Sequence, residues 1–330
     1  MNKALLLSSL IILFSVFQGC ADENASQPLS ETRLLLNTVC TITIYDPGAN
    51  PAPLSRVFDL CAEYEAMFSR TVEGSDIWRI NNAGGEAVSV DPRTAELILS
   101  GIYYGKLLGG KFDITIGRVS ELWNFGAGAN VPDSAALAEA RDTVDFRGIT
   151  VTGNTVRLAD PRAALDLGGI AKGWIADRAA EFLIAHGVES AIINLGGDIR
   201  FIGLRSGGEP WRVGVQRPFA ENGELAGVIS TGAPAVASSG VYERFFECGG
   251  VIYHHILDPS TGFPVQTDIA GVTLIAESAM IADAVSTLII LAGSERAGEI
   301  FAQAAGLIGA VLILKSGEII ELGDIDFEKF

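Results

Sequence analysis

Hydrophobic and polar residues follow two different periodicities along this chain. Alternation over residues 40–45, which read CTITIY, predicts a half-buried strand. Apolar residues recur every three or four positions over Leu54–Phe68 and Thr94–Leu108, which predicts two helices. Strands and helices are therefore mixed along the chain without a strict alternation.

Other short stretches predict strands that pair with a neighbour in sequence. Residues 149–158 read ITVTGNTVRL and predict a hairpin that turns at Gly153-Asn154. Residues 211–216 and 227–231 predict a second pair of strands. The sequence therefore predicts an α+β fold in which helices pack on a largely antiparallel sheet.

Two longer segments each pass from a strand through a polar turn into a helix. In 164–187 a short strand leads into a glycine turn and an amphipathic helix, which we expect Gly187 to end. In 272–293 a strand over 272–276 precedes a helix from about Ser278 to Leu291. Each segment places polar groups at the start of its helix.

The N-terminus has the pattern of an export signal. The apolar run Ala4–Phe17 is too short to span a bilayer, which needs roughly 20 apolar residues. Gly19 followed by Cys20 resembles the lipobox of bacterial lipoproteins, although an ordinary cleaved signal peptide is the alternative. The expected organisation is a lipoprotein signal peptide over 1–19, a lipidated Cys20 with a flexible tether over 20–32, and a single catalytic domain over 33–330.

The net charge excludes one class of partner, and the cysteine count limits the possible disulfides. The 23 basic and 40 acidic residues give a net charge of −17, which repels nucleic-acid phosphates and excludes nucleic acid as a partner. Apart from Cys20 the chain has Cys40, Cys61 and Cys248, which allow one disulfide, but buried free thiols are the favoured interpretation.

A carboxylate and a hydroxyl share one face of the second predicted helix. Asp283 and Thr287 are four residues apart, so their Cβ atoms lie about 5–6 Å from each other. Both side chains can reach one Mg²⁺ ion, which prefers oxygen ligands. The alternative is a small polar patch in which Thr287 bonds to its own helical turn.

The other strand-to-helix segment carries groups suited to phosphate. Asp166 precedes Gly168-Gly169, and Lys172 opens the helix. Adjacent glycines let backbone amides approach a ligand, and the start of a helix attracts anions. A simple turn is the alternative, and we interpret the similar glycine pair in 194–199 as structural.

Two histidines are adjacent in the stretch VIYHHILDPSTGFP. If 252–257 is a strand, His254 and His255 point to opposite faces. A histidine of ordinary pKa can accept the proton of a hydroxyl nucleophile. We therefore expect one histidine to serve catalysis and the other to be buried and satisfied.

Six segments, taken together and in this order, resemble the ApbE family of flavin transferases, whose members are commonly exported lipoproteins. The similarity covers roughly residues 33–315. The segments are FDITIGRVSELWNFG (112–126), LDLGGIAKGWIAD (165–177), INLGGDIR (193–200), AVASSG (235–240), YHHILDPSTGFP (253–264) and SAMIADAVST (278–287). One such segment is weak evidence, but six in the correct order are highly specific.

The resemblance implies a T-fold-like α+β architecture and a Mg²⁺-dependent reaction. FAD is cleaved at its pyrophosphate, FMN passes to a Thr or Ser hydroxyl of an exported redox protein, and AMP leaves. The implied metal ligands are Asp283, Thr287 and the carbonyl of Gly169, with Ser286 nearby, and His255 matches the family's base. The implied FAD contacts are Leu36, Thr71, Lys111, Phe112, Asp113, Asp166, Lys172 and Leu257.

Two positions depart from the family pattern. Thr71 stands where many relatives have a tyrosine that packs on the adenine, and Leu36-Asn37-Thr38 stands where the family usually reads Met-Gly-Thr. A stacked aromatic ring is worth on the order of 0.5–1.5 kcal/mol. Looser adenosine binding, or easier entry of water, is the expected consequence of Thr71.

The same site is compatible with more than one function. The leading hypothesis is FMN transfer by an enzyme anchored through Cys20 on the periplasmic side of the inner membrane. A close alternative is a Mg²⁺-dependent FAD pyrophosphatase, in which water replaces the acceptor hydroxyl. A third hypothesis, from a different class, is a flavin-binding lipoprotein without turnover.

Overall fold

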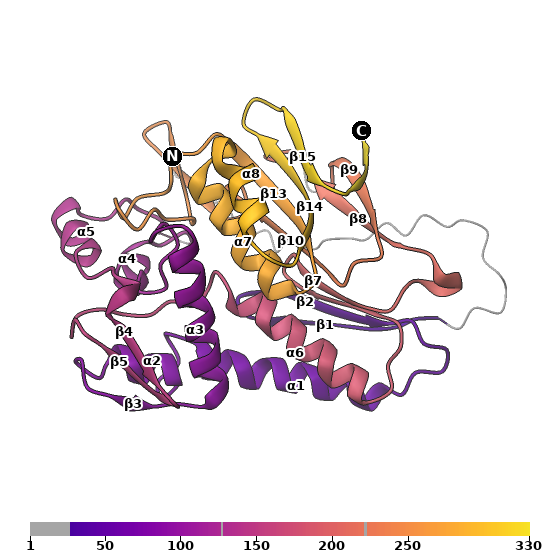
Figure 1. The fold of residues 1–330 in the computed structure, drawn as a ribbon, viewed down its shortest axis with the longest axis horizontal. Helices are drawn as coiled ribbons and strands as arrows, with labels where there is room; N and C mark the ends of the chain where they lie inside the picture. The colour runs from indigo at the N-terminus through magenta and orange to yellow at the C-terminus, as the bar shows by residue number, and fades with distance from the viewer. Residues whose placement is uncertain (1–26, 127, 221–222) are drawn as a thin grey trace.

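An eight-stranded sheet is the largest element of the structure (Figure 1). The computed structural model describes residues 27–126, 128–220 and 223–330. The strands of the large sheet follow the order β1-β2-β6-β7-β10-β13-β14-β15, and every neighbouring pair is antiparallel. The strands are β1 (Leu29–Leu35), β2 (Thr38–Ile44), β6 (Ala191–Leu195), β7 (Asp198–Ile202), β10 (Ala235–Gly240), β13 (Ile269–Ala276), β14 (Leu307–Leu314) and β15 (Ile319–Gly323).

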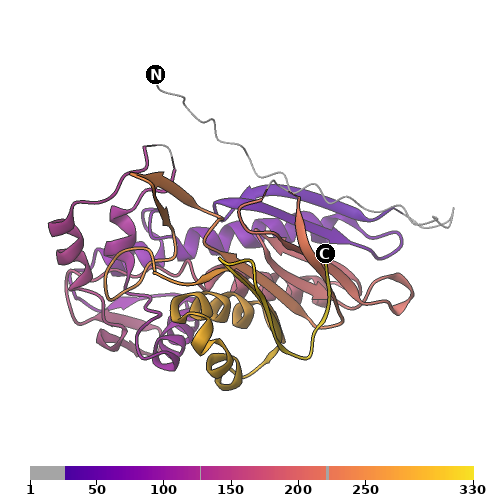
Figure 2. The same cartoon turned by 90° about the horizontal axis from the view of Figure 1, so that it is seen from above.

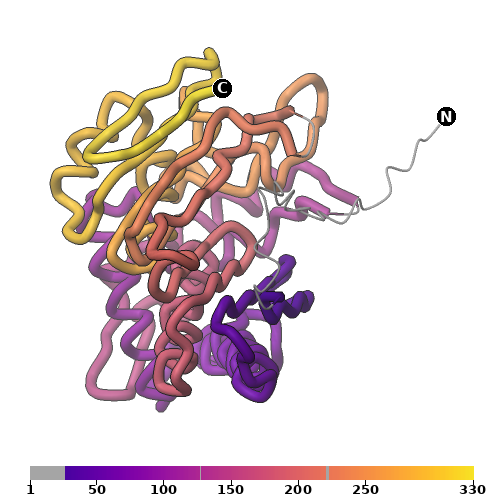
Figure 3. The backbone as a smooth tube through the Cα atoms, turned by 90° about the vertical axis from the view of Figure 1, so that its right-hand side faces the viewer, coloured from indigo at the N-terminus to yellow at the C-terminus, as the bar shows by residue number. Residues whose placement is uncertain are grey.

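Helices cover one face of this sheet. Helix α1 (Pro51–Phe68) packs on β1, α6 (Ala171–Ala185) on β6 and β7, and α7 (Ala279–Ala292) on β10 and β13. Helix α8 (Ser294–Gln303) packs beside α7. The first strand in sequence, β1, and the last strand of this sheet, β15, form its opposite edges, and the indigo and yellow parts of the tube lie apart in Figure 3.

A three-stranded sheet covers the opposite face. It consists of β8 (Trp211–Gln216), β9 (Leu225–Thr231) and β16 (Asp326–Lys329), in the order β16-β9-β8. Its apolar residues share a core with Ile199, Val236 and Val311 of the large sheet. Because both faces are covered, all eight residues of β13 are buried, and the alternation typical of a half-exposed strand is absent there.

The remaining elements gather at one side of the molecule, on the left of Figure 1. They are α2 (Asp76–Asn81), β3 (Val88–Ser89), α3 (Pro92–Leu107), α4 (Gly117–Leu122), α5 (Ser134–Arg141), the 3₁₀ turn Phe146–Gly148, β4 (Ile149–Thr152) and β5 (Thr155–Leu158). A second 3₁₀ turn spans Ser206–Gly208. A separate hairpin, β11 (Phe245–Cys248) and β12 (Val251–His254), stands apart from the main sheet in Figure 2.

The expected α+β class is confirmed, with helices packed on a largely antiparallel sheet. The predicted strand at 40–45 overlaps β2, which ends at Ile44, and the predicted helices correspond to α1 and α3. The two predicted strand pairs are β4-β5 and β8-β9. Gly187 ends α6 at φ +83°, where its amide and that of Val188 bond to Ile184 and Leu183.

Two boundaries differ from expectation. The segment before α6 forms no strand within a sheet, because Ala164 makes only an isolated bridge to Ile116. The strand expected over 252–257 ends at His254, because the chain then turns to bring Leu257 opposite Pro264. Local alternation did not reveal either change, since the first depends on Ile116, far along the chain, and the second on a turn that starts just after His254.

Candidate active site

A cleft of about 860 Å³ runs between the helices and the loops at the ends of the large sheet. It brings together every predicted site residue except Ser286. These residues are Leu36, Thr71, Lys111, Phe112, Asp113, Asp166, Gly169, Lys172, His255, Leu257, Asp283 and Thr287. They come from segments that are up to 251 residues apart in sequence, from position 36 to position 287.

Helices α6 and α7 cross at a glycine, and this crossing fixes Asp283. A Cβ atom on Gly173 would lie only 2.3 Å from the carbonyl oxygen of Ala279, so the two backbones are in contact. The Gly173 amide donates to Asp283 Oδ2 at 3.0 Å. Asp177, one turn further along α6, accepts from the amides of Ala279 and Met280 at the start of α7. The α6 segment therefore sets the position of α7.

Lys172 lies between two buried carboxylates. Its ammonium nitrogen is 3.8 Å from Asp283 Oδ1 and hydrogen-bonds directly to Asp198. Burial opposes the charged ammonium, but the two carboxylates outweigh it and raise the pKa of Lys172. Burial also raises the pKa of Asp198, and Asp283 raises it further. Sequence reasoning missed Asp198, although it follows the glycine pair of 194–199 that we interpreted as structural.

That glycine pair is a tight turn at the edge of the cleft. Gly196 and Gly197 have φ of +69° and +103° and join β6 to β7, and both line the cleft. The turn that joins β1 to β2 also has two residues at positive φ, Leu36 at +56° and Asn37 at +55°. This conformation suits the twist of a hairpin but is unfavourable for leucine.

Asp166 is held in place by both a backbone amide and an arginine. Its Oδ1 accepts from the Gly168 amide at 2.9 Å, and its Oδ2 lies 3.3 Å from Arg70 Nε. Arg70 lines the cleft beside Thr71, whose hydroxyl is 3.1 Å from Ser69 Oγ. Arg70 is a cation of the site that sequence reasoning missed, because its pairing with Asp166 joins segments far apart in the chain.

Asp113 is satisfied by its own surroundings. Its carboxylate accepts from the amide and hydroxyl of Thr115 and from the Phe146 amide, at 2.6–2.8 Å. Burial raises its pKa despite these bonds. Phe112 packs against Gly169, where an added Cβ would lie 3.0 Å from the ring. These two residues shape the wall of the cleft next to the glycine turn.

The two histidines have different environments. His255 lines the cleft, its amide donates to the Arg244 carbonyl at 3.1 Å, and its Nδ1 has no hydrogen-bond partner among the described residues. Burial and the positive charge of Arg244 lower the pKa of His255 to about 3. His254 is buried outside the cleft lining, and burial lowers its pKa to about 4. Its Nδ1 also has no hydrogen-bond partner among the described residues, so the expectation that the second histidine is satisfied is wrong. The imidazole of His255 is therefore neutral at physiological pH.

The oxygen atoms predicted to bind metal are only partly directed into the cleft. Asp283 and Thr287 line it, as does Gly169. Ser286 is fully buried, where its hydroxyl donates to the Asp283 carbonyl at 2.9 Å and lies 2.7 Å from Ser239 Oγ. Among the described residues, no three His, Cys, Asp or Glu side chains are arranged to hold a metal ion.

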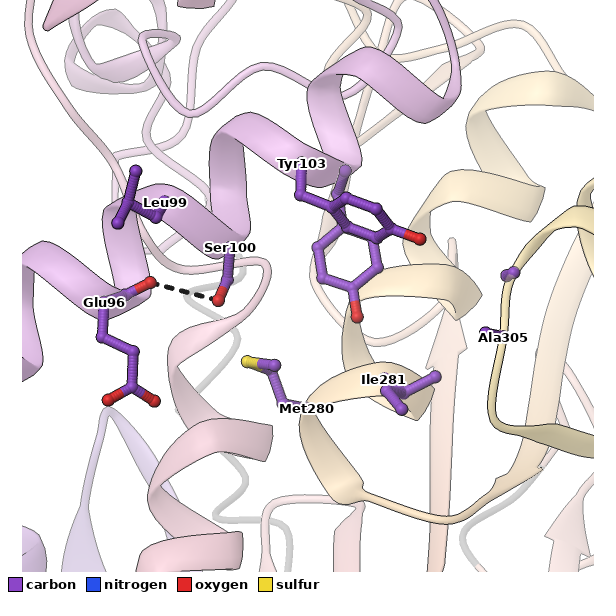
Figure 4. Close-up of a pocket in the computed structure, with 9 residues that line it drawn as sticks. Glu96, Leu99, Ser100, Tyr103, Met280, Ile281 and Ala305 are labelled. Carbon is purple, nitrogen blue, oxygen red and sulfur yellow. Dashed lines mark hydrogen bonds between the residues drawn. The ribbon is translucent and has the colours of Figure 1, made fainter. Parts of the chain in front are cut away.

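A second, more apolar groove of about 510 Å³ lies between α3 and the start of α7 (Figure 4). Leu99 and Tyr103 of α3 face Met280 and Ile281 of α7 across it, and Ser100 bonds to the Glu96 carbonyl at 3.1 Å. None of the predicted site residues lines this groove.

The predictions for the N-terminus and for the cysteines have different outcomes. The signal peptide and Cys20 lie outside the described residues. All three cysteines are free thiols, as predicted; Cys40 and Cys61 are buried, but Cys248 is exposed, so the predicted burial is wrong there. None of the helices in 27–126, 128–220 and 223–330 is long and apolar enough to cross a membrane.

Comparison with known proteins identifies the family. The model of the ApbE family matches residues 36–312. The chain belongs to the ApbE family. Among curated ApbE relatives, the FAD:protein FMN transferase of Treponema pallidum is 35% identical over 88% of this chain and 85% of its own length. The FAD:protein FMN transferase of Vibrio cholerae is 30% identical over 96% and 95%.

Solved ApbE structures share the fold. The crystal structure of the ApbE protein from Thermotoga maritima has a TM-score of 0.82 and 34% sequence identity, and the match covers 89% of this chain and 96% of that one. The flavin transferase ApbE from Vibrio cholerae has a TM-score of 0.79 and 29% identity, with 90% and 96% covered. The expected resemblance is therefore confirmed at the level of both sequence and fold.

Proposed function

We propose that this chain is a FAD:protein FMN transferase that attaches FMN to a Thr or Ser hydroxyl of a partner protein and releases AMP. The observation that carries the proposal is the position of His255. Its Nδ1 lacks a partner among the described residues, and it lines the same cleft as Asp283 and Thr287. The activity of the curated relatives supports the same assignment.

The proposed reaction is a substitution at the phosphorus of the FMN half of FAD. The acceptor oxygen forms a new P–O bond while the P–O bond to the AMP half breaks. The hydroxyl proton passes to the neutral imidazole of His255, and the electron pair of the broken bond leaves with the AMP phosphate. Arg70 and Lys172 are the cations of the cleft that stand next to the Asp166–Gly169 turn and can orient the diphosphate.

The residues present fit a Mg²⁺ ion that is shared with the substrate. Asp283 offers a buried carboxylate, Thr287 a hydroxyl one turn away, and the Gly169 segment a carbonyl, all on the same cleft. Mg²⁺ usually takes few protein ligands and completes its shell with water and phosphate oxygens. When bound, it would offset the charge that develops on the diphosphate as AMP leaves.

FAD hydrolysis is the competing activity, and Thr71 is the feature that favours it. Thr71 lines the cleft with a small hydroxyl group where many relatives have a tyrosine, so less apolar surface excludes water. A flavin-binding protein without turnover is disfavoured, because storage does not require a neutral imidazole in the same cleft as a carboxylate and hydroxyl pair.

One experiment separates these functions. Residues 27–330 are incubated with FAD and Mg²⁺, with and without flavin-free exported redox proteins from the same cells. Transfer gives a covalent FMN adduct, detected by mass spectrometry, and AMP release that depends on the acceptor. AMP release without acceptor, and no adduct with any of them, would establish hydrolysis instead. No AMP under either condition would leave flavin binding alone.

We further propose that the enzyme is exported and anchored through a lipidated Cys20 on the periplasmic side of the inner membrane. The apolar run Ala4–Phe17, followed by Gly19-Cys20, supports this location. A lipid anchor of several acyl chains holds a protein stably, at about 0.8 kcal/mol for each buried CH₂ group. Mass spectrometry of the native protein would contradict the anchor if it found an unmodified Cys20.

A further inference from the structure

Two exposed phenylalanines stand at the mouth of the cleft. Phe219 lies in the connection between β8 and β9, and Phe245 begins β11. They are 49% and 41% exposed, their ring centroids are 5.8 Å apart, and both line the cleft. We call this pair the aromatic rim. Two adjacent rings with this much exposed surface are unusual on a protein face that contacts only water.

Neighbouring side chains support the rim. Phe219 has φ of +58°, a left-handed conformation that is unfavourable for a bulky residue and that packing must maintain. Its ring lies edge-on to Tyr242, with centroids 6.0 Å apart. Tyr242 in turn packs on Gly240, where a Cβ would lie 2.3 Å from the ring. An aromatic surface that is fixed before binding loses little conformational entropy when a partner covers it.

The rim is next to the proposed base. Phe245 follows Arg244 along the chain, and the Arg244 carbonyl accepts from the His255 amide at 3.1 Å. The Arg244 guanidinium also donates to the Asn37 carbonyl at 3.1 Å and so ties the hairpin to the β1–β2 turn. A hydroxyl that reaches His255 must enter the cleft, and the polypeptide that carries it must cover the mouth.

We propose that the aromatic rim docks the acceptor polypeptide by packing against apolar side chains next to its Thr or Ser. This inference rests on the proposed transfer activity. Water as a nucleophile needs no such surface, whereas a protein acceptor does. Exposed aromatic residues commonly provide the central contacts of protein interfaces. The acceptor segment is therefore expected to carry apolar residues beside its hydroxyl.

The test compares acceptor affinity with FAD affinity in matched variants. Phe219→Asn keeps a residue that tolerates positive φ, Phe245→Ser removes the second ring, and Phe330→Ser is the control, because Phe330 is 61% exposed but does not line the cleft. The probe is whichever flavin-free redox protein the unaltered chain labels. Each rim variant should raise the KM for that protein by about tenfold, while the Kd for FAD changes less than about twofold. Phe330→Ser should match the unaltered chain in both.

The other outcomes overturn the proposal in distinguishable ways. An equal rise in the Kd for FAD would place the rim in the flavin site, and unchanged KM values would remove it from acceptor docking. A fall in kcat alone would assign it to the chemical step. If the unaltered chain labels no redox protein at all, the proposed transfer fails and the docking surface fails with it. Thermal unfolding of all three variants checks that each is folded.

Discussion

The ammonium nitrogen of Lys172 lies 3.8 Å from Oδ1 of Asp283, the carboxylate that we assign to Mg²⁺. Lys172 also pairs with Asp198, so one ammonium group lies beside two carboxylates that are almost inaccessible to water. Without Lys172 the two buried carboxylates would repel each other unless one of them took up a proton. The lysine therefore stabilises the site in the absence of metal, and a bound Mg²⁺ would share that role.

Lys172→Met should destabilise the protein and make its stability depend on Mg²⁺. Removing one partner of a buried ion pair typically costs about 3–5 kcal/mol. We expect the free energy of unfolding in urea to fall by roughly 3 kcal/mol and to recover in part when Mg²⁺ is added. Lys106→Met, at an exposed position of α3, is the control and should change stability little. Equal stability of the two variants would contradict the role assigned to Lys172.

Asp283→Asn should remove metal binding while keeping the local hydrogen bond. The amide oxygen of asparagine can still accept from Gly173, but the negative charge is lost. Mg²⁺ affinity, measured by calorimetry, should become undetectable, and the transfer rate should fall by about 100-fold or more. Thr287→Val is a milder change that removes only a neutral ligand. Wild-type metal affinity in Asp283→Asn would exclude this carboxylate from the metal site.

Gly173→Ala should separate α6 from α7. The added methyl group would lie 2.3 Å from the Ala279 carbonyl, and overpacking of this kind typically costs about 1–3 kcal/mol. Gly298 of α8 offers a matched control, since a Cβ there meets nothing within 4 Å. Gly298→Ala should be neutral or stabilising by up to about 1 kcal/mol. Chemical denaturation of both variants measures the contrast, and equal effects would mean that the crossing tolerates a side chain.

The crossing also shows what sequence patterns can and cannot reveal. Glycine turns and apolar spacing predicted both helices and the strand of the second segment, because those signals are local, but the short strand predicted before α6 is not part of a sheet. The partnership of Lys172 with Asp198 was not predicted, since it joins residues that are adjacent only after α6 packs on β7. Ser286 shares the helix with Asp283, yet its hydroxyl points to Ser239 on a neighbouring strand. Such orientation depends on which element covers each helix face.

Acidification should destabilise the protein through His254. Burial lowers its pKa from 6.5 to about 4. Below pH 6.5 this histidine therefore binds a proton in the unfolded chain but not in the folded one. This contribution to stability is complete above pH 6.5 and decreases as pH falls toward 4, by about 3 kcal/mol in all. His254→Gln should show a correspondingly smaller loss of unfolding free energy across this range. His186→Gln, at an exposed position, should follow the unaltered chain.

His255 and His254 should differ in catalysis although they are neighbours. The Nδ1 atoms of both rings are unpartnered among the described residues, but only His255 lines the cleft. Replacing a general base typically lowers the rate by 10²–10⁴-fold, so His255→Ala should transfer FMN that much more slowly while binding FAD normally. His254→Ala should lose stability but retain most of its rate per folded molecule.

Because the pKa of His255 is lowered to about 3, the imidazole stays neutral well below pH 6.5. The transfer rate should therefore not fall between pH 7 and 5, as it would with a histidine of ordinary pKa. The FMN transfer rates of His255→Ala and His254→Ala, measured once each variant is shown to be folded, test the assignment of the base. A severe loss in His254→Ala alone would assign the base to the buried ring, and unchanged transfer in His255→Ala would remove the base from this segment altogether.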